Sequence, residues 1–169
     1  MAKHFKLTNE TKVNFMGVTL YRIECTLDFK WARVGDKGGW VEKEGNISGN
    51  AWVYGNAEVY GNAWVYGDAW VYGNAEVYGN AEVCGNAEVC DNAEVCDNAD
   101  YCCFQSFGSA NRNTTVFKQE DGSLRVQCGC FSGTIQEFAE AADKTHGDSK
   151  FGKEYRAMIE LIKVRFGIE

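Results

Sequence analysis

One segment of the chain carries the polar side chains needed to hold an anion. It begins at Gly108 and ends with Arg112, Asn113, Thr114 and Thr115. An arginine guanidinium offers a planar fork of donors that matches phosphate oxygens, and amide and hydroxyl groups add neutral donors. Composition alone favours a solvated loop here, and the functional alternative is an anion pocket.

A second stretch could complete such a pocket. Thr134 and Glu137 have the spacing of a capping box, so a helix should begin near Thr134 and present free N–H groups at its amino end. Phe131, just before it, could stack on a nucleotide base. We therefore predict that a small anionic ligand of the nucleotide type binds Arg112, Asn113, Thr114, Thr115, Phe131 and Thr134.

Few residues are available for catalysis. The two histidines, His4 and His146, lie outside residues 50–103, and His146 is expected at the surface between two helices. The sequence has no glycine-rich phosphate loop, serine nucleophile elbow or two-histidine metal motif. Cys130 could act as a nucleophile near a helix start, but a structural thiol is the simpler interpretation. We predict a non-enzyme with no catalytic residue and no cofactor.

The cysteines point to free thiols. Eight cysteines would suggest disulfides in a secreted chain, but the first five residues lack the apolar core of a secretory signal. Cys84, Cys90, Cys96 and Cys102 recur every six residues, which places successive thiols on different faces and too far apart for one tetrahedral metal. We predict no metal site and a cytoplasmic protein.

A strict internal repeat must position these residues. Residues 50 to 103 form nine six-residue units, each opening with Asn or Asp followed by Ala, and Val stands two residues after Ala in eight of them. In an extended segment, Ala and Val point to one side and the residues flanking Val point to the other. Gly or Asp followed by Asn or Asp then suits a tight turn. Each unit therefore predicts one short strand and one corner.

The unit Asn50-Ala51-Trp52-Val53-Tyr54-Gly55 resembles the hexapeptide-repeat family. The resemblance implies a left-handed parallel β-helix with three units per turn, in which residues eighteen apart stack at a strand separation of about 4.7 to 4.9 Å. Acyltransferases of that family use a histidine general base on the coil at a subunit boundary. Because the repeat of this chain holds no histidine, the resemblance to those enzymes ends with the fold.

The outward positions of the repeat are aromatic in its first half and acidic throughout. Such an apolar surface is larger than a soluble monomer usually exposes. Glu58, Glu76 and Glu94 should stack as an acidic row, and another face should carry Glu82 and Asp100. We predict a homotrimer with roughly parallel shafts, whose interface contains Trp52, Tyr54, Trp64, Tyr66, Trp70 and Tyr72.

The period divides the chain into three regions and predicts a mainly β fold. Residues 1–37 should form a small β cap, with a hairpin leading into a strand over Thr19–Cys25. Residues 38–103 are predicted as the β-helix, with its first rung at 38–41. Residues 104–169 are predicted as an α+β module.

Two hairpin strands and two helices are expected in that module. The strands run over 114–119 and 123–128, around the turn signal Asp121-Gly122. The first helix begins near Thr134, and the second runs from Lys150 to about Arg165. Gly167 can end the second helix.

The terminal segments carry a narrower resemblance. Leu7-Thr8, Leu20-Tyr21-Arg22-Ile23 and Gly35-Asp36-Lys37-Gly38-Gly39-Trp40 resemble the opening of hexapeptide-repeat proteins encoded by bacteriophages and prophages. Segments like 108–115 and 128–134 recur as motifs in the same proteins. The resemblance implies a phage origin.

Charge limits the choice of partner. The net charge is −7, and residues 38–103 hold eleven acidic residues against the single Lys43, so the shaft should not bind nucleic acid. No apolar run approaches the length of a membrane span.

Three functions remain open. They are a counter-defence binding protein that sequesters a nucleotide-type ligand in the infected cell, an acidic decoy or DNA mimic that blocks a host protein, and a minor structural phage protein. We favour the first.

Overall fold

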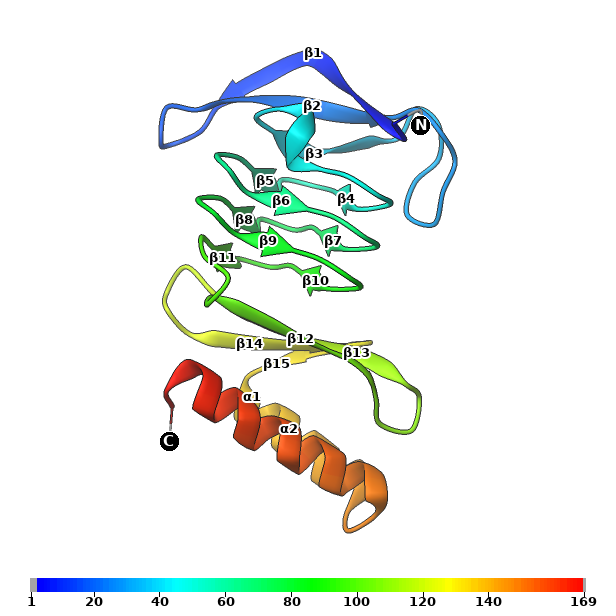
Figure 1. The fold of residues 1–169 in the computed structure, drawn as a ribbon, viewed down its shortest axis with the longest axis vertical. Coiled ribbons are helices and arrows are strands. Elements are labelled where there is room, and N and C mark those ends of the chain that lie inside the picture. The colour runs from blue at the N-terminus through cyan, green and yellow to red at the C-terminus, as the bar shows by residue number, and fades with distance from the viewer. Residues whose placement is uncertain (1–2, 169) are drawn as a thin grey trace.

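The structure is a computed structural model that describes residues 3–168. An N-terminal hairpin covers one end of a stack of parallel coils, and a four-stranded sheet with two helices closes the other end (Figure 1). The strands of the cap and shaft are β1 Phe5–Val13, β2 Thr19–Cys25, β3 Lys37–Val41, β4 Trp52–Val53, β5 Glu58–Val59, β6 Trp64–Val65, β7 Trp70–Val71, β8 Glu76–Val77, β9 Glu82–Val83, β10 Glu88–Val89 and β11 Glu94–Val95.

The shaft has the interior that the repeat predicts. Every Ala and Val of the units from Ala51 to Val95 is buried, and Val71 and Val77 are fully enclosed. Parallel pairing joins Trp52 to Trp70, Glu58 to Glu76 and Trp64 to Glu82, so residues eighteen apart are neighbours on one face. The predicted stack of parallel coils is confirmed.

Glycine makes the corners of the coils. The last residue of successive units has a positive φ, from 69° at Gly55 to 68° at Gly85, in the region where a side chain is strained. At the next equivalent place the repeat substitutes Asp91, which keeps the same conformation with φ 57°. Short polar side chains tolerate this region better than other non-glycine residues, so the corner survives the change.

The N-terminal strands form the predicted cap. β1 and β2 pair antiparallel around a turn at residues 14–17, and β3 joins β2 antiparallel on one side and β5 parallel on the other. Trp40 and Val41 of β3 pair with Glu58 and Val59, which makes β3 the first rung of one face. A short 3-10 turn, η1 at Glu44–Asn46, follows β3.

Two of the three shaft faces are covered within the chain. The loop between β2 and β3 packs Phe29 and Trp31 against the face of β4, β7 and β10. Leu20 and Trp40 cover Tyr60 on the face of β5, β8 and β11. The face of β6 and β9 keeps an exposed Trp64.

The C-terminal sheet begins earlier than expected. Its strands, in the order β12-β13-β14-β15, are β12 Tyr101–Phe107, β13 Arg112–Lys118, β14 Leu124–Cys128 and β15 Phe131–Gly133. Residues 101–103, expected as part of the last repeat unit, pair antiparallel with β13 instead. Asp100 is likewise buried rather than stacked on Glu82. The ninth unit has Tyr101 in place of the Val of the others, and this side chain packs into the shaft interior while its backbone pairs with β13.

Side chains of this sheet alternate between two cores. Tyr101, Cys103 and Phe117 face the shaft interior. Val116, Val126 and Cys128 face the helices, together with Cys102 and Phe104. The sheet therefore closes the end of the shaft with one face and supports the helices with the other.

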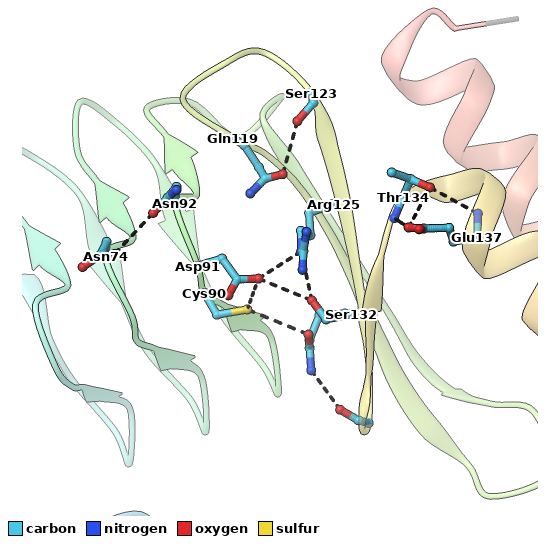
Figure 2. Close-up of polar contacts among 12 residues, drawn as sticks. Asn74, Cys90, Asp91, Asn92, Gln119, Ser123, Arg125, Ser132, Thr134 and Glu137 are labelled. Carbon is cyan, nitrogen blue, oxygen red and sulfur yellow. Dashed lines mark hydrogen bonds and ion pairs between the residues drawn. The ribbon is translucent and has the colours of Figure 1, made fainter.

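Polar side chains fasten the sheet to the last coil (Figure 2). The guanidinium of Arg125 lies 2.9 Å from the carboxylate of Asp91 and donates to Ser132 at 3.0 Å. On a neighbouring strand, the N–H of Glu88 donates to the hydroxyl of Thr115 at 3.1 Å. These contacts fix the C-terminal module on the shaft.

Both predicted helices are present. α1 spans Ile135–His146 and begins at the Thr134–Glu137 capping box, and α2 spans Lys150–Phe166 and ends at Gly167, which has φ 65°. Tyr155, Met158, Ile159 and Ile162 form the buried stripe of α2. Within residues 3–168, no helix is long and apolar enough to cross a membrane.

Asp100 should make stability depend on pH. Burial by itself raises the pKa of its carboxyl, but hydrogen bonds from Lys118, Cys96 and Asp97 more than offset this and hold the pKa below its usual range. Because the folded pKa is lower than the unfolded value of about 3.9, this stabilisation is complete above about pH 5 and is lost as the pH falls through the folded pKa.

We therefore expect Asp100→Asn to lower the free energy of unfolding by about 1–2 kcal/mol at neutral pH. The difference from the parent should shrink below about pH 4. Urea unfolding at both pH values measures it. A difference that stays constant down to pH 3 would contradict the ionised role of Asp100.

Candidate functional site

The structure encloses two of the predicted ligand-binding residues. Thr114 and Thr115 lie inside β13 and are 0% and 1% exposed. The hydroxyl of Thr114 donates to Cys128 Sγ at 3.2 Å, and that of Thr115 accepts from the backbone of Glu88. A ligand at the surface does not reach these groups, so their prediction as ligand contacts is corrected. Their hydroxyls instead form hydrogen bonds within the sheet and to the last coil.

Arg112 and Asn113 remain accessible at the start of β13. The guanidinium of Arg112 lies over Gly129, where an added Cβ would come within 2.9 Å of Nη1. Phe131 is half-buried and packs on Phe138, with ring centroids 5.3 Å apart. Ligand binding by Arg112 and Asn113 stays a prediction, whereas one side of the Phe131 ring is taken by the helix-side core.

Thr134 lines a groove that the sequence did not predict as a site. The groove has a volume of about 690 Å³ and lies between β14, the first half of α1 and the second half of α2. Its apolar wall contains Leu124, Ile135, Ala139, Ile159 and Ile168, and its polar rim contains Ser123, Thr134, Gln136, Arg156, Glu160 and Lys163.

The amino end of α1 opens at this rim. Thr134 accepts a hydrogen bond from the N–H of Glu137, and the carboxylate of Glu137 accepts from Thr134 N at 2.8 Å (Figure 2). The N–H groups of Ile135 and Gln136 have no acceptor within the helix, because the first turn of any helix leaves such groups free. Their positive potential is partly offset by the carboxylate of Glu137, which accepts hydrogen bonds from both the N–H and the hydroxyl of Thr134.

Two cationic side chains, Arg156 and Lys163, lie at the rim, and they differ in the number of their hydrogen-bond and ion-pair partners. Arg156 is held by Asp143 at 2.8 Å, Asp148 at 3.3 Å and the carbonyl of Gly147. Among residues 3–168, the one ion-pair partner of Lys163 is Glu160, at 3.2 Å on the preceding turn of the same helix. Exposed pairs of this kind contribute little, so Lys163 can exchange its carboxylate for a ligand anion.

The sequence contains one signal for part of this groove, which is the spacing of Ile159 and Lys163. Lys163 lies four residues after Ile159, so both lie on one side of α2. The sequence does not show that the two helices diverge enough at this end to leave room. That separation depends on tertiary packing.

Both histidines make contacts within the chain. His4, which lies outside the repeat in the sequence, donates from Nε2 to the carbonyl of Ala51 at 2.8 Å, and burial lowers the pKa of its imidazole. His146 stacks on Tyr155. All eight cysteines are free, and burial raises the pKa of Cys90 to about 11. Within residues 3–168, no cluster of three or more His, Cys, Asp or Glu side chains is placed to hold a metal ion.

The predicted trimer interface is corrected at three of its six residues. Trp52 is 1% exposed beneath His4 and Phe29. Trp70 stacks on Trp31 with centroids 4.8 Å apart and planes 17° apart, and Tyr72 is half-buried beside it. The β2–β3 loop therefore occupies the surface assigned to a neighbour. Tyr54, Trp64 and Tyr66 are left for contact with another molecule.

The Trp31–Trp70 stack should be measurable as a stability coupling. Single Ala substitutions should each destabilise the chain, and the double variant should lose less than their sum by about 0.5–1.5 kcal/mol. A double-mutant cycle in urea measures this coupling. Additive losses, or a change of oligomeric mass in place of a loss of stability, would show that Trp70 faces another chain.

The protein is a mainly β solenoid, and its C-terminal module contains a groove large enough for a small ligand, with Arg156 and Lys163 at its rim. No protein-family model matches the chain, and a search of curated proteins gives no match.

Proposed function

We propose that the protein binds a small anionic ligand of the nucleotide type without transforming it, and so acts as a sponge for that ligand. The observation that supports this most is the groove of about 690 Å³ between β14, α1 and α2. Sites for ligands of this size usually measure about 300–1,000 Å³ and combine an apolar wall with a few polar groups.

The groove offers one surface for the base of a nucleotide and another for its phosphate. Leu124, Ile135 and Ile159 offer an apolar wall for a base. Lys163, together with the amino end of α1, offers charge and donors for a phosphate. This moves the proposed site from Arg112 to the groove and keeps Thr134 as a contact.

We further propose that the shaft is a left-handed parallel β-helix of the hexapeptide-repeat class, and that the chain is of phage origin and acts in the cytoplasm of the infected bacterium. The six-residue repeat and the resemblance of the terminal segments to phage-encoded proteins support this. A ligand that host defence uses as a signal would fit a binding protein in that setting. The proposed role is counter-defence by sequestration.

Calorimetry tests the proposed function. Titration with ADP-ribose and with a cyclic dinucleotide should give saturable binding with a micromolar or lower Kd for at least one of them, and the ligand should be recovered unchanged. An uncharged nucleoside is the control for nonspecific binding to the apolar wall. No binding of either anion, or turnover of a bound one, would contradict a sponge.

The acidic decoy is the second candidate, and one observation favours it. Glu76, Glu94 and Glu120 line a hollow of about 270 Å³ beside Phe15. Burial, with Glu58, Glu94 and Glu120 nearby, raises the pKa of Glu76, although its hydrogen bond from Tyr60 acts in the opposite direction. Glu58, however, is already paired with Lys12 at 2.6 Å.

Replacing both Glu76 and Glu94 with Gln separates the two functions. The sponge predicts that protection of phage in a defence assay survives this change. A decoy predicts that protection is lost while nucleotide binding is unchanged.

A further inference from the structure

β12 is an open edge of the C-terminal sheet. The sheet order ends at β12, and within residues 3–168 no strand pairs with its outer side. Its sequence from Tyr101 to Phe107 contains no charged residue and no proline. Soluble proteins usually protect such edges with charge, proline or a covering segment, because bare backbone groups pair with another strand. Over residues 101–104 those protections are missing, and only beyond Phe104 does a bulge, with Ser106 at φ 64°, interrupt the edge.

Two hollows flank this edge, one on each side of the sheet. The hollow on the shaft side has about 440 Å³ and is lined by Tyr66, Glu82, Cys84, Asn98, Tyr101, Cys102, Cys103, Gln105 and Arg165. The hollow on the helix side has about 390 Å³ and is lined by Cys102, Cys103, Phe104, Leu161, Val164 and Arg165. A strand added to β12 would place its alternate side chains in these two hollows.

The apolar surface continues beyond the edge in both directions. On α2, Leu161 is 56% and Val164 is 79% exposed. On the shaft, Trp64 is 41% exposed and stacks on Tyr66 at 4.1 Å. In Figure 1, β6, β9, β12 and α2 all lie towards the viewer. One side of the molecule therefore combines an unpaired strand with apolar side chains above and below it.

We propose that a second copy of this chain pairs with the first through β12, edge to edge and antiparallel, as a two-fold dimer. Identical antiparallel strands in one sheet are related by an axis perpendicular to the sheet. Both copies then keep their helices on one side of the joined sheet and their shafts on the other. The exposed stripe of α2 meets its equivalent, and the Trp64 faces approach each other.

A second copy fits this surface better than a single extended peptide. A peptide strand would fill the two hollows but would leave Val164 and Trp64 exposed. The charge of the chain does not oppose the dimer here, because the charged residues lining the hollows are Glu82 and Arg165, one of each sign.

Light scattering of the purified chain tests the dimer. The parent should have the mass of two chains at micromolar concentration, and Leu161→Glu with Val164→Glu should raise the dissociation constant by about 100-fold or more, because the new carboxylates would be buried together. Both residues are exposed in the single chain, so the variant should fold, as circular dichroism can verify. Val13→Glu, at a 66% exposed position in the hairpin, is the matched control. A mass of one or three chains for the parent, or a dimer that survives both changes, would overturn the proposal.

Hydrogen exchange tests the strand pairing itself. Those amides of residues 101–104 that point away from β13 should become more protected as the parent concentration rises, and the double Glu variant should show no such gain. A parent dimer in which β12 exchange does not depend on concentration would place the interface elsewhere and reject this one. Neither experiment involves the ligand groove, so their outcome is independent of the proposed function.

Discussion

Val71→Asp should leave the shaft unfolded under conditions in which the parent is folded. Val71 is fully buried, and the residues paired with it on the two neighbouring coils are the apolar Val53 and Val89, which cannot receive a carboxylate. Burial of an unpaired charge in a packed core costs about 4 kcal/mol or more, a large part of the stability of a small protein. Circular dichroism and urea unfolding measure the loss.

Val13→Asp is the control for this substitution, because Val13 is 66% exposed in the N-terminal hairpin. It should change the free energy of unfolding by less than about 0.5 kcal/mol. If Val71→Asp behaves like the control, Val71 does not lie inside a packed coil, and the assigned inward and outward positions of the repeat are wrong.

The sequence predicted the interior of the shaft because its period is local. Once Ala51 and Val53 are taken as inward, the same assignment follows for every later unit. The eighteen-residue stacking was implied by the resemblance to hexapeptide-repeat proteins, which have three units per turn, and the pairing of Trp52 with Trp70 agrees with it. Local signals also predicted the helix ends, because the capping box at Thr134 marks the start of α1 and Gly167 marks the end of α2. These signals act over a few residues.

What covers the outward positions was not predictable in this way. Trp52, Trp64 and Trp70 occupy the same outward position of their repeat units. The β2–β3 loop packs over Trp52 and Trp70 but not over Trp64, which stays exposed. That loop has no period and no strand pattern. Its docking depends on Phe29 and Trp31 finding a face of the shaft after the chain has turned back.

The candidate site shows the same limit. Residues 108–115 looked like a polar segment leading into a strand expected from Thr114, but β13 begins at Arg112 and lies between two other strands. Buried threonines are acceptable there because the thiol of Cys128 and the backbone of the last coil satisfy them. Only Thr134 was both predicted and placed in the groove.

Lys163→Ala should have the largest effect on the proposed ligand binding. A charge-assisted contact contributes about 1.5–3 kcal/mol, so the Kd for the bound nucleotide should rise by roughly 10- to 150-fold. In the described part of the chain Lys163 pairs only with Glu160, on the surface of α2, so its removal should not unfold the helix. Calorimetry with the same nucleotide measures the change.

Lys153→Ala is the matched control, because it removes the same charge from an exposed position on the same helix outside the groove. It should leave the Kd within about two-fold, since a distant exposed charge is screened by salt. Equal losses in both variants would indicate general attraction of an anion to the module, and a loss only in Arg112→Ala would return the site to its first predicted place.

The most direct test of the account is to map the ligand on the folded protein by backbone amide chemical shifts. Titration with the nucleotide that binds in calorimetry should shift the amides of Leu124, Ile135, Gln136 and Lys163 together, with one saturation curve. The amides of Arg112 and of the row Glu58, Glu76 and Glu94 should stay in place. Shifts confined to Arg112 and Asn113, shifts along the acidic row, or no saturable shift at all would contradict a ligand site between β14, α1 and α2.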